Sequence, residues 1–187
     1  MRWHHRRVPN SVTARDDEQE RRPGAVLFVY TWDLALAILA LFGALAPFAG
    51  AVQTGSGKTA AIPLVAQVVE AVSSASYAAT LIIIAALLTR KRAWVRLTQI
   101  GTLATAMGLA AISIVVGAIV GNGVDAPALI VTLIFVLLDA LAIVIMTERR
   151  VVHFYDQVAS IPAYVWATLG LWVGGSVMTI VIDAVAH

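Results

Sequence analysis

The chain alternates between long apolar segments and short polar ones. Five apolar segments are long enough to cross a membrane, because about 20 helical residues at 1.5 Å each span a hydrocarbon core of about 30 Å. We place them at about residues 34–52, 62–89, 95–120, 129–146 and 164–186. Runs such as LIIIAALL lack the alternation of a membrane β-strand. The pattern therefore predicts an all-α integral membrane protein, a bundle of five transmembrane helices.

Composition identifies lipid as the solvent of these segments. Hydrophobic residues make up 60% of the 187 residues and charged residues only 13%, which is more apolar than an ordinary soluble domain. The chain has no cysteine, which excludes a disulfide, a thiolate metal site and a cysteine nucleophile. The histidines are His4, His5, His153 and His187, all outside the predicted spans. We therefore expect no metal, haem or other cofactor inside the membrane.

Basic residues predict the orientation of the bundle. Cytoplasmic loops retain lysine and arginine, and twelve of the 13 basic residues fall on one side if the amino terminus is inside; Lys58 alone falls outside. The first 24 residues then form a polar, arginine-rich cytoplasmic tail. Residues 25–187 form the transmembrane domain, with an extracytoplasmic carboxyl terminus. We expect a multi-pass protein of the plasma membrane, whose tail suits anionic lipid and does not require nucleic acid.

The stretch TGSGKT, residues 54–59, resembles the phosphate-binding loop of RNA helicases and many other ATPases. That loop joins a buried strand to a helix whose N–H groups hold phosphate. Here a predicted membrane helix precedes it, and Val52 stands where the pattern G-x-x-x-x-G-K-[ST] requires glycine. The predicted orientation also places Lys58 outside the cytoplasm. We interpret the stretch as a turn between two helices, and we favour a non-enzymatic protein over an enzyme.

Two acidic residues inside the predicted spans form the candidate site. Glu70 and Asp139 lie in the second and fourth segments, roughly 12–15 Å below the outer surface at 1.5 Å per residue. A carboxylate within the bilayer costs at least a few kcal/mol, so it is a functional candidate. No lysine, arginine or histidine lies in any span core. The two carboxyl groups are therefore expected to be protonated, to share a proton, or to face a cation or water.

Polar residues at helical spacing form stripes on three segments. The stripes are Gln67, Glu70, Ser74 and Tyr77 on the second, Thr98, Thr102 and Thr105 on the third, and Thr168, Ser176, Thr179 and Asp183 on the fifth. We expect these faces to turn away from lipid. They either form interhelical hydrogen bonds, each worth about 0.6–2 kcal/mol, or line a hydrated pathway or binding cavity.

Two further aspartates lie near the ends of their predicted spans and are interpreted as interfacial. Asp33 is expected to pair with the tail or with the basic residues 90–92, and Asp183 with Lys58. Phe28, Tyr30 and Trp32 form an aromatic girdle that precedes or opens the first span, so that helix could begin nearer Ala25.

The segment after the fourth span, residues 147–164, mixes charged and aromatic residues and returns through Pro162. We expect it to lie along the inner membrane interface. His153 and Asp156 are interpreted as part of a solvated turn in preference to a metal-binding or catalytic pair.

Glycine spacing suggests where helices meet. Gly117 with Gly121, and Gly170 with Gly174, have the G-x-x-x-G spacing that lets two backbones approach closely. The same spacing serves packing within one chain or assembly into a homo-oligomer, and the sequence does not choose between them.

Two functions remain open. The first is a non-enzymatic structural or accessory subunit that packs against a larger membrane assembly, favoured by the small size and the lack of a soluble domain or catalytic constellation. Its partners would be lipid and other membrane protein subunits. The second is a homo-oligomeric transporter or channel that uses Glu70 and Asp139 for protons or cations.

Overall fold

The computed structural model describes residues 24–48, 64–120 and 126–186, and the elements of this part of the chain are helices. They are α2 (Gly24–Leu45), the short 3₁₀ helix η1 (Ala46–Phe48), α3 (Leu64–Leu87), α4 (Ala93–Val120), α5 (Ala126–Thr147), α6 (Arg149–Phe154) and α7 (Ala163–Ala186). Five of them, α2, α3, α4, α5 and α7, are long and apolar enough to span a membrane. The predicted all-helical class, with five helices long and apolar enough to span a membrane, is therefore confirmed for the described residues.

Several predicted features lie outside the described residues. They are the arginine-rich tail, the TGSGKT stretch with Lys58, and Gly121. The side chain of Asp183 is also not described, although its backbone belongs to α7. The interpretations of these residues stay predictions.

Prolines mark the beginnings of several helices. Pro63 immediately precedes α3, and Pro127 is the second residue of α5, positions where proline's missing N–H leaves no helical bond unmade. Pro162 precedes α7, and its carbonyl accepts a hydrogen bond from the Val165 N–H at 3.0 Å. At the other end of α2, Pro47 lies in η1, where the α-helix has given way to a tighter turn.

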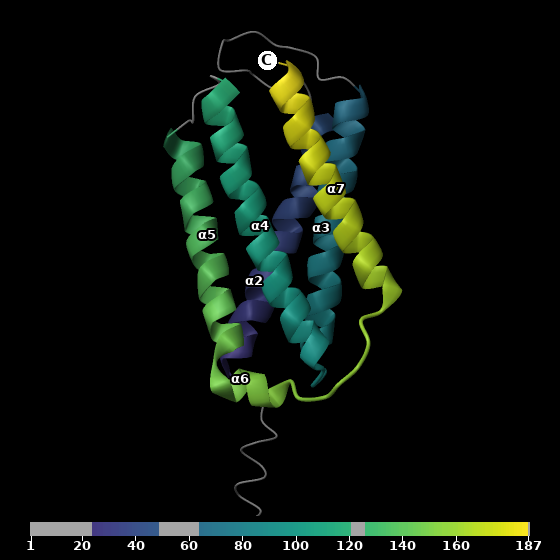
Figure 1. Ribbon diagram of the computed structural model, residues 1–187, viewed down its shortest axis with the longest axis vertical. Coiled ribbons are helices and arrows are strands. Elements are labelled where there is room, and N and C mark those ends of the chain that lie inside the picture. Colours follow the sequence, from purple (N-terminus) through teal and green to yellow (C-terminus); the bar gives the residue numbers. More distant parts are fainter. Residues whose placement is uncertain (1–23, 49–63, 121–125, 187) are drawn as a thin grey trace, which may run out of the picture.

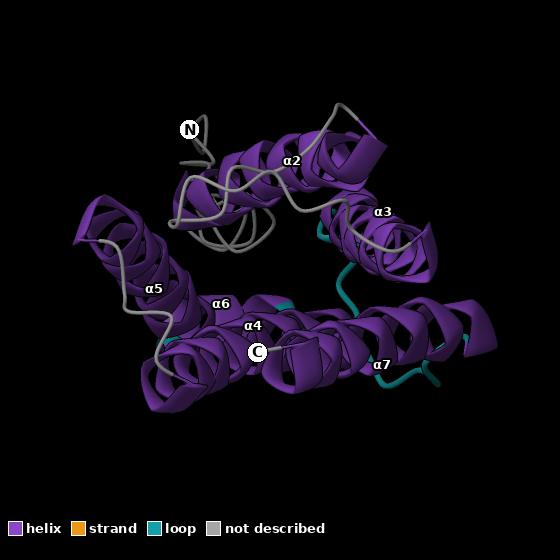
Figure 2. Ribbon diagram, turned by 90° about the horizontal axis from the view of Figure 1, so that it is seen from above, coloured by secondary structure: helices purple, strands orange, loops and turns teal. Residues whose placement is uncertain are grey.

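The long helices alternate in direction (Figure 1). α2, α4 and α7 run away from the end of the bundle that carries α6, and α3 and α5 run toward it. We call this end the α6 end. Seen along the bundle, α2 and α3 form one layer, and α5, α4 and α7 form the other (Figure 2). The most extensive contacts join α2 to α3 and α3 to α7, followed by α4 to α5.

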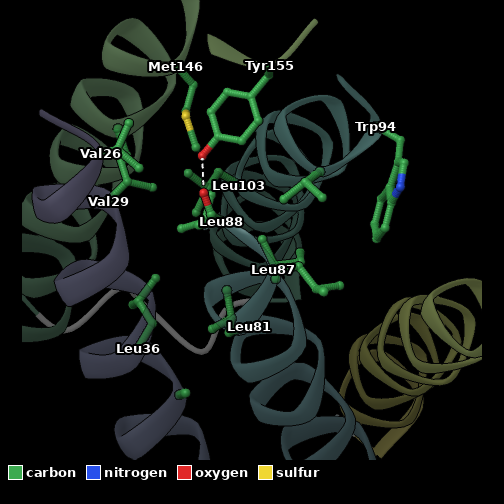
Figure 3. Packing of buried hydrophobic residues seen from close by; sticks show 14 of the residues in the cluster. Val26, Val29, Leu36, Leu81, Leu87, Leu88, Trp94, Leu103, Met146 and Tyr155 are labelled. Atoms are coloured by element: carbon green, nitrogen blue, oxygen red, sulfur yellow. Dashed lines mark hydrogen bonds between the residues drawn. The ribbon is translucent and has the colours of Figure 1, made fainter. Parts of the chain in front are cut away.

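The buried core lies toward the α6 end (Figure 3). The buried residues of α4 fall between Trp94 and Leu103, and those of α5 are Asp139, Ala142 and Met146. In their other halves, α4 and α5 expose large apolar side chains: Ile112, Val115, Ile119, Ile130 and Ile134. Apolar side chains turned outward in this way suit helices whose solvent is lipid.

Hydrogen bonds fasten the α6 end. The Tyr155 hydroxyl donates to the Leu88 carbonyl at 2.7 Å, which ties the end of α6 to the end of α3 (Figure 3). The Ala93 N–H donates to the Gln157 carbonyl, and the Gln157 N–H to the Lys91 carbonyl, each at 3.0 Å. The α3–α4 turn and the α6–α7 connection are therefore held together as one unit.

Candidate functional site

Buried polar side chains gather in one layer of the bundle. Asp33 of α2 and Gln99 of α4 are 0% exposed, Thr102 of α4 is 1% exposed and Asp139 of α5 is 5% exposed. At 1.5 Å per residue, Asp33, Thr102 and Asp139 lie about 12–14 Å along their helices from the α6 end, and Gln99 lies one turn closer to it. We call these four residues, with Trp32, the polar layer.

Asp139 is held by a tryptophan of another helix. The Trp32 indole Nε1–H donates to Asp139 Oδ1 at 2.8 Å. The same indole packs against the Phe135 ring, four residues before Asp139, with centroids 5.6 Å apart. Trp32 thus fixes the carboxyl group of Asp139 and covers the neighbouring turn of α5.

Asp33, the next residue of α2, is bonded to a third helix. The Gln99 amide Nε2–H donates to Asp33 Oδ1 at 2.6 Å. Successive helical residues point in directions about 100° apart, so a single turn of α2 binds α5 through Trp32 and α4 through Asp33.

The prediction that Asp33 is interfacial, paired with the tail or with residues 90–92, is wrong. Its carboxyl group is fully buried and its hydrogen-bond partner is Gln99. The error came from the helix start: α2 begins at Gly24, so Asp33 lies nine residues inside the helix. The same early start turns Trp32, interpreted as an interfacial aromatic residue, into a partner of Asp139.

Three oxygen atoms of the polar layer have no hydrogen-bond partner although they are buried. They are Asp33 Oδ2, Gln99 Oε1 and Thr102 Oγ1. Because Gln99 and Thr102 are three residues apart, they lie on the same face of α4. Leaving a buried polar atom unpaired costs about 1–3 kcal/mol, so three of them in one layer require an explanation.

Among the residues that the structure describes, no positive charge is bound to the two aspartates. Within the described part of the chain, the hydrogen-bond partners of Asp33 and Asp139 are an amide and an indole, both neutral. The nearest arginine on α4, Arg96, instead donates from Nη1 to the Met146 carbonyl at 3.3 Å, where a cation is favourable at the end of α5.

The other predicted site residues lie on α3. Tyr77 stacks on Trp172 of α7 with ring centroids 4.5 Å apart. Ser74, Glu70 and Gln67 follow on the same face toward the opposite end, and each is half-buried. Glu70 lies about 25 Å along α3 from the α6 end, against about 12 Å for Asp139 along α5. The structure therefore brings Asp33 into the layer of Asp139 and places Glu70 nearer the opposite end of the bundle.

The polar stripes of α4 and α7 behave differently. On α4, Thr98 and Thr102 are buried, as predicted. On α7, Thr168 and Thr179 donate to carbonyl groups of their own helix at 3.1 and 3.0 Å. Ser176 alone among the described α7 stripe residues bonds another helix, because its hydroxyl lies 3.0 Å from Ser73 Oγ of α3.

Helices α3 and α7 cross most closely at Ser73, a residue that sequence reasoning passed over. Its hydroxyl donates to the Trp172 carbonyl at 3.0 Å. A Cβ atom added at Gly175 would lie 2.7 Å from Ser73 Cβ. Gly175 therefore permits this crossing, whereas a methyl group added at Gly170 or Gly174 would meet no atom within 4 Å.

Small residues also form outward faces on two neighbouring helices. Methyl groups added at Gly101 and Gly108 of α4 would likewise meet no atom within 4 Å. The same holds at Gly117, which is nine residues from Gly108 and therefore lies on another side of the helix. On both α4 and α7, exposed alanines continue these faces: Ala104, Ala111, Ala163 and Ala167. The G-x-x-x-G glycines that are described are not used for packing within the chain.

The chain matches no protein-family model, no curated protein and no solved structure. The functional inference rests on the polar layer and on the outward faces of α4 and α7.

Proposed function

We propose that this protein is a multi-pass membrane transporter or channel that passes a proton or a small cation through its polar layer. The observation that carries the proposal is the pair of buried aspartates, Asp33 and Asp139, on two spanning helices with neutral hydrogen-bond partners. A buried carboxyl group either takes up a proton or, if it stays ionised, needs a compensating positive charge. Inside a membrane such groups mark ion pathways and proton relays.

The proposal moves the functional pair from Glu70 and Asp139 to Asp33 and Asp139. Asp139 keeps its place, and Asp33 joins it because both residues are buried at a similar distance along their helices from the α6 end. Glu70 lies farther along the bundle, on the polar stripe of α3. An ion crossing the whole membrane would need polar groups beyond the layer, and the Glu70 stripe is suited to supply them on the side away from α6.

In this proposal the α6 end lies in the cytoplasm of a plasma-membrane protein. The described basic residues support this orientation, because they gather at that end: Arg90, Lys91, Arg92, Arg96, Arg149 and Arg150. The test is labelling of single introduced cysteines, in a chain that has none of its own. Asp156→Cys should react with a membrane-impermeant maleimide only after the cells are opened, and reaction in intact cells would refute the orientation.

The functional test measures ion flux in vesicles containing the purified protein. Asp33→Asn and Asp139→Asn keep the size of each side chain and remove its charge. We expect both to reduce proton or sodium flux to the level of empty vesicles, while Asp156→Asn, an exposed aspartate outside the layer, keeps the wild-type flux. Each variant is first checked for a wild-type elution profile in detergent.

The outcome also assigns a role to Glu70. Under the transport proposal, Glu70→Gln reduces flux with unchanged expression, because the charge is lost and the shape is kept. If the wild-type protein gives no flux under either ion gradient, or if the Asp33→Asn and Asp139→Asn double variant carries ions normally, the transport proposal fails.

A second candidate is the structural or accessory subunit, which the outward faces of α4 and α7 favour. Without a hydrophobic drive between helices in lipid, close approach through glycine and alanine is a main source of association. Four described glycines on these faces, whose added methyl groups would meet nothing within 4 Å, are available for this purpose: Gly101, Gly108, Gly170 and Gly174. A second copy or a foreign subunit would fill these faces.

The test of this candidate is the mass of the native complex, purified from its own membranes in mild detergent. Foreign subunits in fixed proportion would support the accessory role and name the partner. A homo-oligomer dispersed by Gly108→Leu, with wild-type stability of the monomer, would support assembly through α4. A monomer in native lipid would refute both forms of the candidate.

A further inference from the structure

The three unpaired oxygen atoms of the polar layer are of three chemical kinds. Asp33 Oδ2 is a carboxylate oxygen, Gln99 Oε1 an amide carbonyl oxygen and Thr102 Oγ1 a hydroxyl oxygen. All three residues are at least nine-tenths buried. Their elements are packed together, because Gln99 of α4 is bonded to Asp33 of α2. The arrangement therefore presents several oxygen lone pairs inside the protein.

The hydrogen bond between Gln99 and Asp33 determines which atoms remain free. Gln99 donates from Nε2 to Asp33 Oδ1, so its carbonyl oxygen is the atom left over. The second carboxylate oxygen of Asp33 remains beside it for the same reason. Thr102, one turn along α4 on the same face, adds its hydroxyl.

Oxygen atoms of these kinds are ligands for hard cations. A water molecule would satisfy their hydrogen bonds but would leave the carboxylate charge uncompensated in a buried site, which is costly. A proton on Asp33 Oδ2 would remove that charge and would donate to Gln99 Oε1, while the Thr102 hydroxyl carries a proton of its own to donate. A small cation would instead compensate the charge and take oxygen atoms of these kinds as ligands, and Na⁺ binding separates the two cases.

The composition of the layer favours a monovalent ion. Ca²⁺ takes six to eight oxygen ligands, and Mg²⁺ dehydrates reluctantly and keeps several waters, whereas the layer offers three buried oxygen atoms. Transition metals prefer nitrogen or sulfur ligands, and the described residues contain no group of three His, Cys, Asp or Glu side chains placed to hold one. Asp139 lies in the same layer, and when ionised it adds a second negative charge that attracts a cation.

We infer that Asp33 Oδ2, Gln99 Oε1 and Thr102 Oγ1 form a binding site for a monovalent alkali cation of the size of Na⁺. The inference rests on the proposed function in one respect: the site would be the place in the transport pathway where the transported or coupling ion binds. Trp32 positions Asp139 beside it without being a ligand. The site links α2 to α4, so an occupied site would also stabilise the bundle.

The test is Na⁺ binding to the full-length protein in mild detergent. We measure ²²Na⁺ binding directly and the melting temperature in sodium chloride against choline chloride at equal concentration. The wild-type melting temperature should rise with sodium and level off at saturation, because a ligand that binds the folded state stabilises it. Choline is too large for the site and should have no such effect.

Three threonine variants separate binding from general stability. Thr102→Val keeps the shape of the side chain and removes the hydroxyl, and it should weaken Na⁺ binding at least about tenfold, the effect of losing one ligand worth about 1.4 kcal/mol. Thr102→Ser restores the oxygen and should restore most of the affinity. Thr132→Val, whose hydroxyl bonds the carbonyl of Ala128 in its own helix, should bind like the wild type. Asp33→Asn should abolish binding.

The outcomes distinguish this inference from the proposed function. Equal stabilisation by sodium and choline, or Thr102→Val and Asp33→Asn proteins that bind Na⁺ like the wild type, would overturn the site. Proton flux that depends on Asp33 in a protein that binds no Na⁺ would overturn the site and leave the transport proposal standing. Saturable Na⁺ binding lost in Thr102→Val, in vesicles that carry no ion, would support the site and overturn transport.

Discussion

The crossing of α3 and α7 offers a sharp test of the fold. In Gly175→Ala, the added methyl carbon would lie 2.7 Å from Ser73 Cβ and 3.2 Å from Ser73 Cα. Carbon atoms pack at about 3.5–4.0 Å, so the two helices must move apart by about 1 Å. Ser73 is the residue whose hydroxyl bonds the Trp172 carbonyl and the Ser176 hydroxyl, both at 3.0 Å. The same movement therefore stretches both hydrogen bonds.

The cost can be set against a matched neighbour. Overpacking costs about 1–3 kcal/mol, and two weakened interhelical hydrogen bonds add about 1–2 kcal/mol. Gly174→Ala makes the same chemical change one residue away, where the methyl group meets nothing within 4 Å. Both variants gain about 1 kcal/mol of helix propensity, which cancels in the comparison. We expect Gly175→Ala to be less stable than Gly174→Ala by about 2–5 kcal/mol.

The measurement is thermal unfolding in mild detergent, followed by tryptophan fluorescence, which reports on Trp172 at the crossing. For a chain of this size, 1 kcal/mol corresponds to about 2–4 °C, so the two variants should melt at least about 4 °C apart. Melting temperatures within about 1 °C of each other would show that α3 and α7 do not cross at Gly175. The close packing of Gly175 against Ser73 would then be refuted as well.

Two further substitutions test individual hydrogen bonds by the same melt. Trp32→Phe keeps an aromatic ring and removes the donor to Asp139, and it should lower the free energy of unfolding by about 1–2 kcal/mol. The control is Trp166→Phe, which changes an exposed indole and should lower it much less. Equal losses of stability in the two variants would contradict the hydrogen bond between Trp32 and Asp139. Tyr155→Phe removes the donor that joins α6 to the end of α3 and should cost about 0.5–1.5 kcal/mol, against no measurable change for the exposed Tyr164→Phe. A Tyr155→Phe protein as stable as the wild type would mean that this bond does not hold the α6 end.

Helix number was readable from the sequence because lipid imposes a simple requirement. Each spanning segment must be long, apolar and internally hydrogen-bonded, and these are local properties of the chain. The five predicted segments correspond to α2, α3, α4, α5 and α7. The presence of Asp139 within a span followed from the same reasoning.

Part of the polar layer was missed for an identifiable reason. Asp33 lies in a stretch where aromatic residues suggested the membrane interface, so the helix start was placed too late. Beginning the helix directly after the Pro23–Gly24 pair would have placed Asp33 deep in the first span. Gln99 was available as well, since it stands beside Thr98 in the polar part of the third segment, but no local pattern pairs it with Asp33.

The sequence by itself predicted that lipid is the solvent, and it determined that five helices are long and apolar enough to span a membrane and that acidic groups lie within them. The tertiary structure decided which groups meet. Trp32 and Asp139 are 107 residues apart and Asp33 and Gln99 are 66 apart, so their contacts depend on the rotation and tilt of whole helices. One residue turns a helix by about 100°, which is why Gly175 lies at a crossing while Gly174 faces outward. Apolar character along a chain does not specify that rotation; the packing of the five helices against one another does.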